Sequence, residues 1–256
     1  MYLDQMINEL LKVNHFKAEI PKDQSEKEKI LNYLRTITLS EDLSETYYEL
    51  EKDYLNSKPK DIIYVEDIKD KLIDGIYIYK GDITRIKADA IVNAANEKML
   101  GCFIPGHACI DNAIHMSAGM KLRHACYEIM KEQGYDEPVG HAKITEAYEL
   151  PSSYVIHTVG PNMNGSETMT LEKAKEALKK CYISILDQAA ENRIKNLVFC
   201  SISTGVYGLP IKVGAKVALE TISKYLKNNK ETFEKIIIDV FSEEDYEIYK
   251  NQADRF

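Results

Sequence analysis

Two cysteines and a histidine lie close together near the middle of the chain. Four residues separate Cys102 from His107, one more separates His107 from Cys109, and a Pro-Gly pair bends the segment between them. Thiolate and imidazole are ligands that zinc prefers, so the spacing favours one Zn2+ per chain. Three protein ligands would leave a fourth position open, as in catalytic sites, whereas Asp111 or His115 could close the site as a structural one. A metal-free alternative, with buried thiols beside an unrelated histidine, fits the same spacing.

Polar side chains that could handle a sugar or a water lie on both sides of this segment. Asn93 and Asn96 fall at the carboxyl end of an expected buried strand, where open α/β sheets bind ligands. Their amides could hydrogen-bond sugar hydroxyls, or they could shape a turn. Asp111 comes near the start of an expected helix, where the helix dipole favours a carboxylate without any function. Beside a metal, Asp111 could instead orient a water or a sugar hydroxyl.

Two further loops could hold the other parts of a nucleotide. Asp82, after the first expected strand, could accept a hydrogen bond from the exocyclic amine of a base, or could only form a turn. The segment 201–210 joins a buried strand to a helix, and its main-chain amides could hold a phosphate without basic side chains. It lacks both the P-loop lysine and the dinucleotide-binding glycine spacing, so an ordinary connecting loop is the alternative. Tyr207 in this loop could lie against a sugar.

Composition limits the class of partner. The 256 residues include 33 Lys and Arg against 41 Asp and Glu, a net charge of −8. Such a charge repels nucleic acids and anionic membranes, so we expect neither as a partner. The N-terminus carries no basic, apolar leader, and no run is long enough to span a bilayer. Five cysteines without a secretion signal favour a reducing, cytoplasmic location.

The elements that would position these residues fall into two parts. Residues 1–70 show helical spacing of leucine, isoleucine and tyrosine, with Ser25 and Ser40 as expected helix caps. Beyond them, strands are expected at 76–79, 89–93, 143–148, 154–157, 197–200 and 235–241, and helices at 110–133 with a break at Gly119, 171–192, 213–226 and 243–251. This alternation predicts a three-layer α/β/α domain with a helical N-terminal extension before it.

The order of these motifs resembles the macrodomain family. The resemblance rests on the series Gly81-Asp82-Ile83-Thr84, Asp89-Ala90-Ile91-Val92-Asn93-Ala94-Ala95-Asn96, Ile114-His115, Ala118-Gly119 and Ser203-Thr204-Gly205-Val206-Tyr207-Gly208. It implies a mixed sheet and a cleft for ADP-ribose, and divides the chain into an extension at 1–70 and a macrodomain at 71–256.

The resemblance also assigns roles. It implies that Asp82 contacts the adenine amine and Ile83 the edge of the base through its backbone. The diphosphate would lie on the loop of Ser203, Thr204, Gly205, Val206 and Tyr207. The catalytic candidates at the distal ribose are Asp111, Asn96 and Asn93.

The cysteine-containing segment is similar to one class within this family. Where many hydrolytic macrodomains carry a glycine run, this chain has Cys102, His107 and Cys109, as in the zinc-containing macrodomains of microbes, which also carry a helical extension. That class is associated with sirtuin-type ADP-ribosyltransferases and lipoylated carrier proteins. The stretch Tyr207-Gly208-Leu209-Pro210 is closer to the general macrodomain pattern.

The resemblance therefore implies a zinc-dependent hydrolase that releases ADP-ribose from mono-ADP-ribosylated proteins. The alternative is a non-catalytic ADP-ribose reader in which the zinc is structural. A third possibility, a protein that binds RNA or poly(ADP-ribose), is disfavoured by the net charge of −8.

Overall fold

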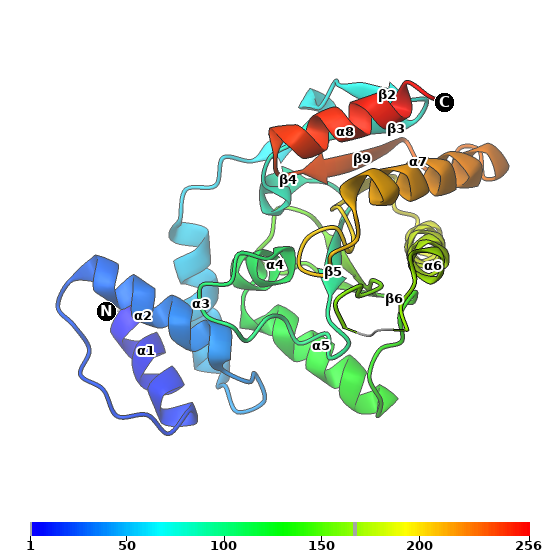
Figure 1. The fold of residues 1–256 in the computed structure, drawn as a ribbon. Helices are drawn as coiled ribbons and strands as arrows, with labels where there is room; N and C mark the ends of the chain where they lie inside the picture. Colours follow the sequence, from blue (N-terminus) through cyan, green and yellow to red (C-terminus); the bar gives the residue numbers. More distant parts are fainter. Residues whose placement is uncertain (1, 166–167) are drawn as a thin grey trace.

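A seven-stranded mixed sheet forms the centre of the molecule (Figure 1). The computed structural model describes residues 2–165 and 168–256. Across the sheet the strands are β2 (Lys71–Ile73), β3 (Ile76–Lys80), β9 (Lys235–Val240), β8 (Asn196–Phe199), β5 (Ala90–Ala95), β7 (Tyr154–Val159) and β6 (Ala142–Glu146). The inner strands run parallel, and β2 and β6 are antiparallel at the two edges.

Helices cover both faces of this sheet. On one side lie α4 (Ile110–Ala118) and α5 (Met120–Gln133), and on the other α6 (Leu171–Glu191) and α7 (Ile211–Asn228), with α8 (Glu243–Ala253) against α7 and β3. The break between α4 and α5 falls at Gly119, whose φ of 92° suits glycine. The predicted three-layer α/β/α fold with a mixed sheet is confirmed.

The inner strands bring the candidate site residues to one edge of the sheet. β5 is almost entirely buried, which is why its sequence is apolar apart from Asn93. Because parallel strands end at the same edge, the segments that follow β3, β5, β8 and β9 lie together there. A short parallel pair, β1 (Ile63–Tyr64) with β4 (Ile86–Lys87), adds a second small sheet beside the short helix η2 (Ile83–Arg85).

Three helices form the N-terminal extension: α1 (Tyr2–Val13), α2 (Gln24–Ile37) and α3 (Glu45–Ser57). Their apolar faces share a core of their own, which includes Met120 from α5 of the α/β domain. Asp23 caps α2 and Ser44 caps α3, so the expected caps Ser25 and Ser40 were wrong by two and four residues. In each case the side chain nearer the helix start accepts the backbone hydrogen bond.

The extension is joined to the α/β domain by buried charges. Arg35 of α2 donates to Glu51 of α3 at 2.6 Å and to the carbonyl of Met116 in α4 at 2.7 Å. The other oxygen of Glu51 accepts from the backbone amide of Met120, at the start of α5. Arg123, also from α5, donates to three carbonyls at the carboxyl end of α2. The two parts are therefore joined by buried polar contacts as well as by Met120, which reaches into the core of the extension.

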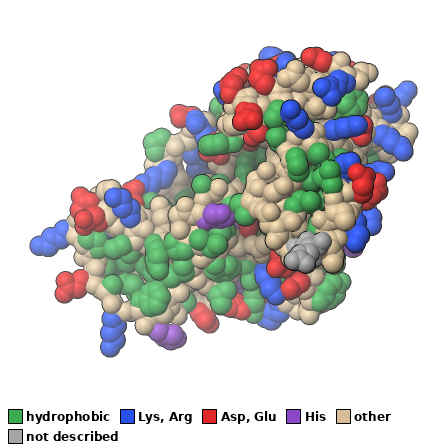
Figure 2. Space-filling view, in the orientation of Figure 1, with side chains coloured by type: hydrophobic (Ala, Val, Ile, Leu, Met, Phe, Trp, Pro, Cys, Tyr) green, Lys and Arg blue, Asp and Glu red, His purple; other side chains and the backbone are tan. Residues whose placement is uncertain are grey.

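The surface mixes charges of both signs. Figure 2 shows Lys and Arg side chains interspersed with Asp and Glu on the face in view, with no broad basic area of the kind that binds a nucleic-acid backbone. Within the described ranges no helix combines the length and the apolar character needed to cross a membrane.

Candidate functional site

The loop after β5 gathers the two cysteines and the histidine. Cys102 Sγ lies 3.3 Å from His107 Nδ1, and the donor atoms of Cys102, His107 and Cys109 are all within 4.8 Å of one another. A tetrahedral zinc with its usual bond lengths separates a sulfur and a nitrogen ligand by about 3.6 Å. The three side chains therefore fit a zinc ion, and the turn at Gly106, with a φ of 73°, is what brings them together.

The protonation of Cys109 depends on whether a cation is bound in this loop. Burial raises the pKa of the Cys109 thiol to about 12, against a hydrogen bond from the amide of Asn112, and the neighbouring Cys102 raises it further. A bound cation reverses this effect, since it favours the thiolate. The donor group, as formed by the described residues, includes neither Asp111 nor His115. The arrangement is thus one of three ligands rather than a closed set of four.

Asp111 lies at the centre of a buried amide network. Its two oxygens accept from Asn93 at 2.8 Å and from Asn96 at 3.2 Å, and Asn96 also donates to the carbonyl of Gly101 at 3.0 Å. Burial raises the pKa of Asp111 to about 6, although the hydrogen bonds from Asn93 and Asn96 and the charge of Arg123 oppose the shift. The structure therefore brings the three catalytic candidates into direct contact, beside the loop of the candidate zinc ligands.

Two histidines lie against this network, and the sequence analysis gave neither of them a role in it. His157 of β7 places Nδ1 3.1 Å from the amide of Asn93, and His115 of α4 places Nε2 3.5 Å from Asp111. Burial lowers the pKa of His157 to about 3 and, together with Arg123, lowers that of His115, so both rings are neutral. The pairing of neighbouring strands β5 and β7 is the only signal that could have linked His157 to Asn93.

The same two histidines form a second group of donor atoms with Cys126. The three donor atoms are fully buried and lie within 4.8 Å of one another. His157 Nε2, however, already lies 3.0 Å from the hydroxyl of Thr145, and the charge of Arg123 acts on His115. The hydrogen bond of His157 and the positive charge of Arg123 near His115 therefore both weigh against a cation in this group.

The loop after β8 has the form of an anion site. Among the described residues, the amides of Thr204, Gly205 and Val206 donate to no protein acceptor, and Gly205 and Val206 are exposed. Ser203 is held beneath them, since its backbone has a φ of 65° and its carbonyl accepts from Leu209. Free amides on successive residues are able to hold phosphate oxygens. Tyr207 is half-buried at the end of this loop.

The residues expected to contact adenine lie at the turn after β3. Asp82 accepts from the amide and the hydroxyl of Thr84 through one oxygen and is itself exposed. Ile83 is buried beside it. Sequence reasoning missed Phe241, which was placed inside the last strand; the strand ends at Val240, and Phe241 is 86% exposed. Gly81 donates to the carbonyl of Val240, so this ring lies next to the turn that carries Asp82.

Comparison with known proteins gives the family. The Macro domain family model matches residues 92–218. A protein-ADP-ribose hydrolase of Treponema medium is 41% identical over 241 residues, which are 92% of this chain and 91% of that protein. This chain belongs to the macrodomain family. The T. medium alignment is longer than the 186 residues of 71–256, so it includes part of the extension.

Solved macrodomain structures agree with the fold. The Trypanosoma brucei macrodomain in complex with ADP-ribose superposes with a TM-score of 0.67 at 29% identity, over 85% of this chain and 94% of that one. A mutant of the Oceanobacillus iheyensis macrodomain with ADPR gives a TM-score of 0.64 at 37% identity. It covers 72% of this chain and 95% of its own, so the O. iheyensis macrodomain is shorter than this one.

Proposed function

We propose that this macrodomain is a zinc-dependent hydrolase that releases ADP-ribose from mono-ADP-ribosylated proteins. The observation that carries the proposal is the hydrogen bond from Asn96, which also donates to Asp111, to the carbonyl of Gly101 at the start of the loop of Cys102, His107 and Cys109. The printed name of the T. medium relative, protein-ADP-ribose hydrolase, supports the same reaction.

The carboxyl edge of the sheet offers a place for each part of ADP-ribose, in the order adenine, diphosphate and distal ribose. Phe241 offers an exposed ring on which adenine could stack, and the neighbouring Asp82 would accept from the adenine amine. The amides of 204–206 would hold the diphosphate. The distal ribose would then lie over the carboxyl end of β5, where Asn96 is half-buried.

Hydrolysis would take place at the anomeric carbon of that ribose. A water oxygen forms the new bond to this carbon, and the glycosidic or ester bond to the protein side chain breaks. Asp111, with its pKa near 6, would orient the water and take one of its protons. The leaving side-chain atom regains a proton, which keeps the reaction balanced. Asn93 is fully buried, so its role would be to hold Asp111 rather than to touch the sugar.

The zinc ion would be held by Cys102, His107 and Cys109. When bound, it would supply Lewis-acid chemistry, either by polarising a sugar oxygen or by making a water more acidic. Two predictions rest on the resemblance of this loop to the zinc class. One is a functional link to a sirtuin-type ADP-ribosyltransferase, and the other is a lipoylated carrier protein as the substrate.

The alternative is a reader that binds ADP-ribose and does not cut it. One preparation, assayed for zinc content and for release of ADP-ribose with and without a chelator, separates the two. We expect Cys102→Ala, His107→Ala and Cys109→Ala to lose both zinc and turnover, and His141→Ala, at an exposed histidine, to keep both. Full turnover by zinc-free protein would show that the metal is not required, and retention of the modified protein without release would favour the reader.

A further inference from the structure

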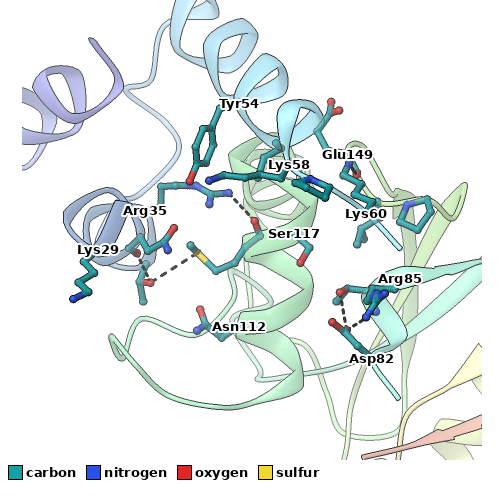
Figure 3. A pocket seen from close by; sticks show the side chains of 18 of the residues that line it. Lys29, Arg35, Tyr54, Lys58, Lys60, Asp82, Arg85, Asn112, Ser117 and Glu149 are labelled. Carbon is teal, nitrogen blue, oxygen red and sulfur yellow. Dashed lines mark hydrogen bonds between the residues drawn. The ribbon is translucent and has the colours of Figure 1, made fainter. Parts of the chain in front are cut away.

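A groove of about 940 Å³ separates the extension from the α/β domain (Figure 3). Its walls come from α2, the end of α3, η2, α4 and the loop of residues 101–109, here called the metal loop because it holds the proposed zinc ligands. Asn93, Asn96 and the 203–207 loop do not line it, whereas Asp82 does, so the groove adjoins the nucleotide-binding edge at the turn after β3. Five basic side chains line it: Lys29, Arg35, Lys58, Lys60 and Arg85.

Two of these cations have no carboxylate partner. In the groove, Arg35 pairs with Glu51, Lys58 with Glu28 and Arg85 with Asp61. Among the described residues Lys29 forms no ion pair, and Lys60 donates only to neutral oxygens of Asn56 and Glu149. Asp61, Asp82 and Glu149 also line the groove, so its attraction for anions is local to Lys29 and Lys60 rather than a broad positive field.

The groove borders the place where a substrate protein must lie. The bond to be cut joins the distal ribose to the protein, so the protein part leaves the nucleotide edge beside the metal loop. Pro105 and Gly106 at the tip of that loop line the groove, and the adjacent Ile104 is 62% exposed. A segment of the substrate protein that flanks the modified residue would therefore pass over this surface.

We propose that the groove binds an acidic segment of the ADP-ribosylated substrate protein, an inference that rests on the proposed hydrolase function. In Figure 3, Lys29 on α2 and Lys60 beyond α3 lie on opposite sides of the groove. A peptide with spaced carboxylates could contact both. Tyr33 and Tyr54 also line the groove and add aromatic surface, as peptide-binding surfaces often have.

The test compares two mono-ADP-ribosylated peptides with the same modified residue. One carries Asp and Glu on both sides of it, and the other carries Asn and Gln. We expect the wild type to release ADP-ribose from the acidic peptide with about fivefold higher kcat/KM, a preference that falls with salt. Lys29→Glu/Lys60→Glu should remove that preference and leave the Kd for free ADP-ribose unchanged. The matched control is Lys224→Glu/Lys230→Glu, at exposed lysines outside the groove.

The outcomes separate the two proposals. Equal kcat/KM for both peptides in the wild type, or an equal loss of preference in the control variant, would overturn the groove. If neither peptide is cut while free ADP-ribose still binds, the hydrolase proposal fails instead. The groove is then judged by the Kd of the two modified peptides, with the same expected order and the same pair of variants.

Discussion

The buried pair of Arg35 and Glu51 makes a sharp prediction about how the extension is held. Both side chains are 3% exposed, and they meet at 2.6 Å. Glu51 also accepts from the amide of Met120 at 2.7 Å, so its two oxygens serve two donors on different elements. Glu51→Gln keeps the size of the side chain but leaves only one acceptor oxygen. One of the two donors must then face the amide NH2.

The expected cost follows from burial. Removing one partner of a buried ion pair leaves an uncompensated charge, which typically costs about 3–5 kcal/mol. Glu51→Gln should therefore lower the free energy of unfolding by about 3 kcal/mol or more. The matched control is Glu49→Gln in the same helix, where the side chain is 62% exposed and pairs with Lys121 at 3.2 Å. An exposed pair of this kind contributes about 1 kcal/mol at most.

Urea denaturation followed by circular dichroism measures both variants. Because the two parts share a core through Met120, we expect one unfolding transition with an unchanged m-value. The double variant Arg35→Met/Glu51→Leu should recover much of the loss, since it removes both charges together. If Glu51→Gln costs no more than Glu49→Gln, the argument from the buried pair is wrong.

Three further predictions follow from the site. Burial and the charge of Asp82 hold the pKa of Asp239 well above its ordinary value. Stability is therefore lost as pH rises through the folded-state pKa, and Asp239→Asn should be more stable at pH 7 by about 1 kcal/mol or more. That gain should vanish towards about pH 4, and equal unfolding curves at pH 7 would contradict it. Phe241→Ala should weaken ADP-ribose binding about tenfold by calorimetry, whereas Phe256→Ala, at an exposed terminal ring, should not. Elemental analysis should find one zinc per chain, and a chelator should lower the melting temperature of the wild type but not of Cys102→Ala.

The sequence was sufficient for most of the fold because local patterns carried it. The apolar run at 197–200 and the glycine at 119 gave β8 and the break between α4 and α5 directly. Helix starts were less predictable, since Asp23, Ser25, Ser40 and Ser44 are all acceptable caps. Which of them accepts the hydrogen bond depends on where the chain meets the core, and that is a tertiary property.

Some residues of the candidate site could likewise be proposed from the sequence, and others could not. Asp82, Asn96 and Asp111 could be proposed as site residues from the sequence because each follows a strand or begins a helix. His157 and Phe241 were missed. The role of His157 depends on the strand register, which places it in β7 opposite Asn93 of β5. The role of Phe241 depends on where β9 ends. Neither is encoded by the residues around it, so neither could be predicted without the pairing of distant strands.

Arg123 links the N-terminal extension to the candidate site. Its guanidinium donates to carbonyls at the end of α2, and the same group lies 4.6 Å from the ring centre of Phe103, the residue after the proposed zinc ligand Cys102. A side chain at Gly101 would approach Arg123 to 3.3 Å and the ring of His115 to 2.9 Å, so the loop passes directly over both. Burial lowers the pKa of Arg123 to about 10, which still leaves it charged. The charged Arg123 of α5 thus contacts both the end of α2 and the loop of Cys102, His107 and Cys109, so the extension helps to fix the position of that loop.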